Sequence, residues 1–170
     1  MTRTATKNMA MAALFAAMAV LLSGFSIPVG PTRCFPFQHA VNAIAGVMLG
    51  PWWAAGAAFT ASLIRNTLGT GTLFAFPGSI PGALVVGFMA RLFKDKRRYA
   101  ALTEPLGTGF IGAMISVYIL APAMGRETTL WLIMSAFLLS SIPGSIMGFA
   151  LLVALNKTHW LQKNVGRSPV

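Results

Sequence analysis

Long, mainly apolar runs, separated by short polar stretches, occupy most of this chain, and Arg65 and Arg91 are the charged residues inside them. Four of them are uninterrupted: residues 8–29, 80–93, 106–121 and 130–155. A fifth run, residues 35–68, is divided by Gly50-Pro51. Proline ends or kinks a helix because it lacks an N–H group and restrains the residue before it. A membrane helix needs about 20 mainly apolar residues, so the pattern predicts six helices that are candidates for membrane spans.

The six predicted spans belong to a single domain over residues 1–170. We place them roughly at residues 8–29, 36–49, 52–68, 80–93, 106–121 and 130–155. The second and third are short, and they form either two spans or a re-entrant hairpin. The predicted fold class is an all-α integral membrane protein, a compact bundle of six transmembrane helices.

The composition supports a membrane protein over a soluble one. Hydrophobic residues make up 56% of the chain and charged residues only 9%, whereas about a quarter of the residues of a soluble domain are charged. So few polar side chains cannot cover a globule in water. We therefore expect the outer apolar side chains to face lipid.

The basic residues indicate an orientation. The formal net charge is +10, which by itself would also suit a nucleic-acid-binding protein. Most of the positive charge, however, lies before the first span, from the end of the fourth span to the start of the fifth, and after the sixth. Basic residues concentrate in cytoplasmic loops, so both termini are predicted to be cytoplasmic, and the charge indicates topology instead of nucleic-acid binding. These residues are Arg3, Lys7, Arg91, Lys94, Lys96, Arg97, Arg98, Lys157, Lys163 and Arg167.

Acidic residues are too few to suggest an enzyme. Asp95, Glu104 and Glu127 are the only ones, and all three fall in predicted loops. Acid–base or metal chemistry in the membrane would need carboxylates or a His/Asp/Glu cluster there, and proton relays need the same groups. We expect no catalytic residue, no metal and no cofactor, and a protein that binds or conducts a molecule.

A first polar cluster lies at the start of the second span. Gln38, His39 and Asn42 are spaced three and four residues apart, so they share one broad helix face. Such a face is unfavourable toward lipid. The three side chains either contact a ligand or form hydrogen bonds with neighbouring helices. Arg33 and Phe37 complete this group of candidate substrate-binding residues.

A second cluster follows the third span. A small heteroaromatic ligand is bound by aromatic walls and a few well-placed hydrogen bonds, and this segment offers both. Its glycines and threonines lack the Gly-Lys-Ser/Thr ending of a phosphate-binding P-loop. The arginine could instead extend to the lipid headgroups. The candidate residues here are Arg65, Asn66, Thr70, Thr72 and Phe76.

The first span carries a strip of small residues. Ala13 and Ala17 lie four positions apart, and small side chains let another helix approach closely. The strip either contacts a partner protein or packs against another helix of the same chain.

Three segments and the overall organisation resemble a known transporter family. The segments are residues 28–39 (PVGPTRCFPFQH), 45–53 (AGVMLGPWW) and 64–79 (IRNTLGTGTLFAFPGS), and they are similar to the ThiW family. Lys7, the alanines of residues 12–17 and the basic loop after the fourth span also resemble the substrate-binding S components of energy-coupling factor (ECF) vitamin transporters.

The resemblance implies a six-helix S component in the cell membrane of a prokaryote. It would capture hydroxyethylthiazole, the thiazole precursor of thiamin, for ATP-driven uptake. Its partners would be an ECF transmembrane coupling protein, contacted through Ala13 and Ala17, and two cytoplasmic ATPases. Two alternatives stay open: an S component for another small neutral vitamin or precursor, and a solitary membrane facilitator.

Overall fold

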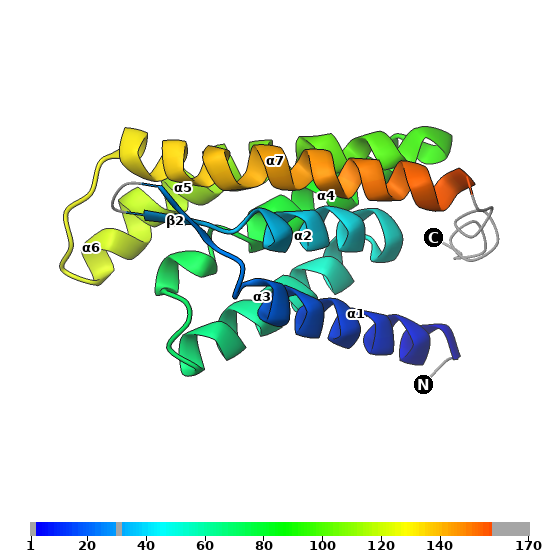
Figure 1. Cartoon of the computed structure of the whole chain (residues 1–170), viewed down its shortest axis with the longest axis horizontal. Helices are drawn as coiled ribbons and strands as arrows, with labels where there is room; N and C mark the ends of the chain where they lie inside the picture. Colours follow the sequence, from blue (N-terminus) through cyan, green and yellow to red (C-terminus); the bar gives the residue numbers. More distant parts are fainter. Residues whose placement is uncertain (1–2, 30–31, 158–170) are drawn as a thin grey trace.

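Helices make up most of the computed structural model, which describes residues 3–29 and 32–157 (Figure 1). The longer ones are α1 (Arg3–Leu22), α2 (Pro36–Leu49), α3 (Pro51–Thr67), α4 (Ile80–Leu92) and α7 (Leu130–Lys157). Shorter helical segments connect α4 to α7: η2 (Lys94–Thr103), η3 (Leu106–Gly112), α5 (Ala113–Ile115), η4 (Ser116–Leu120) and α6 (Ala121–Ala123). One turn of 3₁₀ helix, η1 (Leu73–Ala75), precedes α4. Helical structure is therefore found in each of the six predicted segments.

Several of these helical stretches suit a membrane. Four are long and apolar enough to cross one: Thr4–Leu22, Leu73–Leu92, Leu106–Ala123 and Leu130–Asn156. The helices α2 and α3 are shorter, with 14 and 17 residues. Gly50 separates them with a φ of +80°, a backbone conformation that favours glycine, and Pro51 begins α3. The break predicted at Gly50-Pro51 is present.

The first helix ends earlier than the uncharged run predicts. It ends at Leu22, and residues 27–29 form β1 (Ile27–Val29), which pairs antiparallel with β2 (Thr32–Cys34). Ser23 and Gly24 are weak helix formers, and Pro28 lacks the N–H that a helix needs. The extension of the first span to residue 29 is therefore wrong, because an uncharged run does not distinguish a helix from a hairpin.

Small side chains fill the interior of the bundle and large apolar ones cover its outside. In Figure 1, α2 lies between α1 and α7, and ten of its 14 residues are buried. Alanines form much of the core around it: Ala12, Ala16, Ala45, Ala54 and Ala58. Large exposed side chains include Leu14, Leu21, Leu92 and Trp131. This arrangement suits lipid, where close backbone approach stabilises helix pairs.

The contact between α4 and the start of α3 depends on Gly87. A Cβ atom there would lie 2.8 Å from the carbonyl carbon of Gly50, closer than real Cβ contacts come. Gly87→Ala should therefore lower the free energy of unfolding by about 1–3 kcal/mol, a typical cost of overpacking. Thermal unfolding in detergent measures the effect. Gly56→Ala is the matched control, because a Cβ at Gly56 meets nothing within 4 Å, and equal melting temperatures for both variants would contradict the prediction.

Candidate functional site: a polar cavity between α2, α3 and α7

A cavity of about 490 Å³ opens between α2, the end of α3, the loop that follows it, and α7. Its volume lies in the range of small-molecule binding sites. Aromatic rings form part of the wall, from Phe35, Phe74 and Phe137. Polar side chains from three helices complete it: Gln38, His39, Arg65 and Ser140. The cavity thus combines apolar walls with a few polar groups inside an otherwise apolar bundle.

Gln38 connects three helices beneath the cavity. Its side chain is buried, with 3% exposed. Its carbonyl oxygen accepts a hydrogen bond from Nη1 of Arg65 on α3, and its amide nitrogen donates to the hydroxyl of Ser79, directly before α4. Asn42, one turn further along α2, donates to the Ser79 carbonyl at 3.5 Å. The face predicted on α2 is therefore buried, and its groups bond to neighbouring elements.

Arg65 is buried beside the cavity. Only 2% of its surface is exposed, so its side chain does not extend to the lipid headgroups. The guanidinium carbon lies 4.3 Å from the centre of the Phe35 ring, within reach of a cation–π interaction. Nη2 donates to the Thr70 carbonyl at 3.4 Å, whereas Nε is buried without a partner. In the described part of the chain no carboxylate pairs with this cation.

The loop after α3 folds back over Arg65. The Arg65 carbonyl accepts hydrogen bonds from the backbone N–H groups of Thr70 and Gly71, at 2.9 and 3.0 Å. The Asn66 amide donates to the carbonyls of Ser62 and Thr72, at 2.8 and 3.0 Å. Thr70 and Thr72 consequently line the cavity. Asn66 does not line it and instead fastens the loop to the helix.

The remaining predicted residues lie elsewhere. The rings of Phe37 and Phe76 pack on other aromatic side chains, Phe25 at 6.1 Å and Phe59 at 5.5 Å between ring centres, and neither lines the cavity. The backbone of Arg33 pairs with Pro28 in the hairpin, and its side chain lies outside the described residues. The sequence clusters therefore supply part of the cavity wall, and other members support it from outside.

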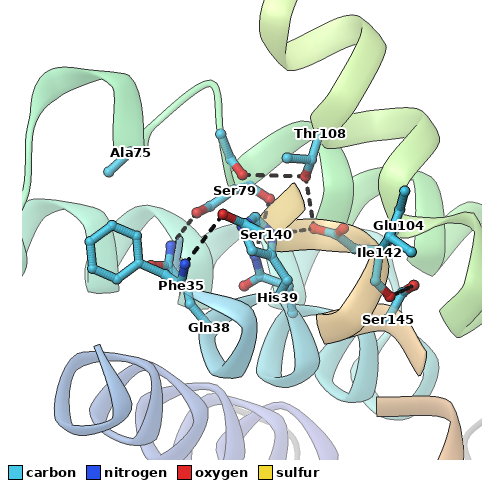
Figure 2. Close-up of polar contacts among 12 residues, drawn as sticks. Phe35, Gln38, His39, Ala75, Ser79, Glu104, Thr108, Ser140, Ile142 and Ser145 are labelled. Atoms are coloured by element: carbon cyan, nitrogen blue, oxygen red, sulfur yellow. Dashed lines mark hydrogen bonds and ion pairs between the residues drawn. The ribbon is translucent and has the colours of Figure 1, made fainter. Parts of the chain in front are cut away.

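Glu104 is the main functional candidate that the sequence analysis misses. It is fully buried, and its Oε1 lies 2.7 Å from Nδ1 of His39 and 2.7 Å from the hydroxyl of Thr108, which donates to it. Figure 2 shows this group next to Ser79 and Ser140. The prediction that all acidic residues lie in loops, with no His/Glu cluster near the membrane, is wrong for this residue.

Helix packing explains how Glu104 becomes buried. The 3₁₀ turns of η2 lead directly into it, and the residue faces Gly82 on α4. A Cβ at Gly82 would come within 2.5 Å of the carboxylate, so the glycine leaves the space that Glu104 occupies. The sequence signal is weak: an acidic residue immediately before an uncharged run, with a threonine four positions later on the same face.

The Asn66 amide should control the mobility of the loop over the cavity. Asn66→Leu removes both of its hydrogen bonds, and a hydrogen bond contributes about 1 kcal/mol. Amide hydrogen exchange in residues 69–72 should therefore become about fivefold to tenfold faster, with little change in melting temperature. Thr67→Val is the control, because that hydroxyl bonds only within its own helix turn, to Ile64 at 2.8 Å. Unchanged exchange in Asn66→Leu would show that the loop is held by other contacts.

Comparison with known proteins agrees with the family suggested by the sequence. No curated protein matches the chain. The model of the ThiW family, described as thiamine-precursor transporter protein, matches residues 9–158. The match includes all the elements that form the cavity, and it covers most of the chain. The chain therefore belongs to the ThiW family of thiamine-precursor transporter proteins.

Proposed function

We propose that this protein is the substrate-binding S component of an ECF-type transporter and captures hydroxyethylthiazole in the cavity between α2, α3 and α7. The main support for the proposal is the composition of the cavity wall in a member of a thiamine-precursor transporter family. Three phenylalanine rings lie beside the buried polar groups of Gln38, His39 and Arg65. A small heteroaromatic ring with one polar substituent matches that combination.

The position of the cavity supports capture from outside the cell. The start of α1 and the end of α7 lie at one end of the bundle in Figure 1, and the hairpin of β1 and β2 lies at the other. The basic residues 94 and 96–98 follow α4, whereas the cavity lies near the start of α2 and the end of α3. By the distribution of positive charge, six spans with cytoplasmic termini would direct the cavity outward, in a multi-pass protein of a prokaryotic cell membrane.

The surface of α1 supports a partner protein. Ala12 and Ala16 are buried in the bundle, whereas Ala13 and Ala17 are exposed. Within residues 3–29 and 32–157, the strip of Ala13 and Ala17 is therefore left uncovered. Another membrane helix could approach it closely, as the coupling protein of an ECF complex would. Energy would then come from the ATPases of that complex, and this chain would act only as the binding subunit.

Ligand binding tests the proposal directly. Calorimetric titration of the purified protein in detergent should detect binding of hydroxyethylthiazole and much weaker binding of thiamin. Gln38→Ala should weaken binding by about tenfold or more, because it removes a hydrogen bond from a charged group that lines the cavity. Ser135→Ala should leave affinity unchanged, since this exposed hydroxyl bonds only to Leu132 in its own helix.

Two results would count against the proposal in different ways. Absence of binding of both compounds to the unmodified protein would overturn the substrate. Unchanged affinity in Gln38→Ala would mean that the ligand binds outside this cavity.

Assembly tests the partner surface. Ala13→Trp and Ala17→Trp together should abolish co-purification with the coupling protein and ATPases, because the added bulk prevents close helix approach, while ligand affinity is retained. Leu139→Trp adds bulk at another exposed position, on α7, and should assemble normally. Normal assembly of the double variant would contradict the proposal that Ala13 and Ala17 contact the coupling protein. Substrate uptake by the chain reconstituted alone would favour a solitary facilitator.

A further inference from the structure

The imidazole of His39 is held through one nitrogen and open at the other. Nδ1 lies 2.7 Å from Oε1 of Glu104. Within the described chain Nε2 has no hydrogen-bond partner, yet it is not among the completely buried unpaired atoms. His39 is 5% exposed and lines the cavity. Because the two ring nitrogens point in divergent directions, the contact with Glu104 does not block Nε2.

Charge balance favours an ionised Glu104 and a neutral His39. Arg65 keeps its charge under all ordinary conditions, and a buried positive charge is less unfavourable when the same interior also holds a negative one. Glu104 is the one fully buried carboxyl group in the part of the chain that the structure describes. Its Oε1 already accepts the hydroxyl of Thr108 at 2.7 Å. With Glu104 negative and His39 uncharged, the buried charges around the cavity cancel.

An ionised carboxylate decides which nitrogen of His39 carries the proton. A carboxylate only accepts hydrogen bonds, so Nδ1 must be the donor and hold the hydrogen. In a neutral imidazole the other nitrogen is then unprotonated and acts as an acceptor. The pair therefore presents an unprotonated Nε2 to the cavity.

We propose that Glu104 is a positioning residue that holds His39 as an acceptor, and that His39 selects neutral ligands which donate a hydrogen bond, such as a hydroxyl group. This inference rests on the proposed function and adds a specificity determinant to it. In hydroxyethylthiazole the donor is the hydroxyl of the side chain, and Nε2 of His39 accepts its hydrogen.

Other polar groups of the cavity do not offer the same acceptor. Gln38 uses both ends of its amide on Arg65 and Ser79. The Ser140 hydroxyl accepts from the Phe35 N–H at 3.2 Å and donates to the Ala136 carbonyl at 3.2 Å. The guanidinium of Arg65 can only donate. The hydroxyls of Thr70 and Thr72 also line the cavity, but a hydroxyl can donate as well as accept. An unprotonated Nε2 of His39 can only accept, so it is the group that distinguishes a ligand that donates from one that does not.

A pair of ligands measures this selectivity. The fluoroethyl analogue of hydroxyethylthiazole retains the size of the hydroxyl compound but has no hydrogen to donate. The unmodified protein should bind the hydroxyl ligand about tenfold or more tightly than the fluoroethyl analogue. Glu104→Gln should reduce this preference to about twofold. A glutamine amide can also donate to Nδ1, so the proton of His39 would no longer be fixed on that nitrogen. His39→Leu should abolish the preference. Ser116→Ala, which removes a buried hydroxyl that bonds to Gly112 in the same part of the chain at 2.7 Å, should leave it intact.

A spectroscopic measurement applies even if those variants do not fold. The chain has two histidines, His39 and His159, so ¹⁵N-histidine labelling of the His159→Ala variant leaves a single imidazole. Nitrogen NMR should then show the proton on Nδ1 and none on Nε2. A proton on Nε2 would overturn the inference.

The ligand series also separates this inference from the proposed function. Equal affinity of the unmodified protein for both thiazoles, or a preference unaffected by His39→Leu, would overturn the inference and leave thiazole capture standing. Absence of binding of either thiazole would overturn the proposed function and, with it, the selectivity inferred from it.

Discussion

The two hydrogen bonds of the Gln38 side chain are the interaction on which the rest of the site depends. They connect α2 to Arg65 on α3 and to Ser79 at the start of α4. A buried guanidinium without such a partner would be strongly unfavourable in an apolar interior. Because Gln38 accepts from it, Arg65 can remain inside the bundle with its face against Phe35. These three helices thus meet around a polar centre whose side chains bond to one another across the elements.

A second polar group supports the same region from the other side. Glu104 reaches His39 from the segment between η2 and η3. The Thr108 hydroxyl lies 2.7 Å from this carboxylate and 3.2 Å from the Gly78 carbonyl, and it donates its single hydrogen to one of them at a time. Figure 2 shows these groups converging near the cavity. Hydrogen bonds between buried polar groups favour one arrangement of the surrounding helices over others, although Oε2 of Glu104 has no partner in the described part of the chain. The residues that shape the ligand site therefore also help to determine how the bundle packs.

Small residues make these close contacts geometrically feasible. Gly82 provides the space that Glu104 fills, and Gly144 on α7 approaches α2 so closely that a Cβ there would lie 2.5 Å from the Cβ of His39. Large apolar side chains are placed on the outside instead, where lipid would accept them. The polar cavity and the apolar surface are thus two results of the same packing.

The sequence by itself determined where the helices lie and where α2 and α3 separate, at Gly50-Pro51. It also determined the segments that supply Gln38, His39 and Arg65. Apolar runs, prolines and polar residues inside the runs are local features of the chain, so they can be recognised without the fold. Only the tertiary structure decided that β1 pairs with β2, that Asn66 fastens a loop outside the cavity wall, and that Glu104 is buried against His39. The burial of Glu104 depends on a partner far away in the chain, since His39 and Glu104 lie 65 positions apart. A carboxylate beside an apolar run has the same local sequence whether it faces water or a histidine on another helix. Its role therefore follows only from the packing that brings the carboxylate and the histidine together.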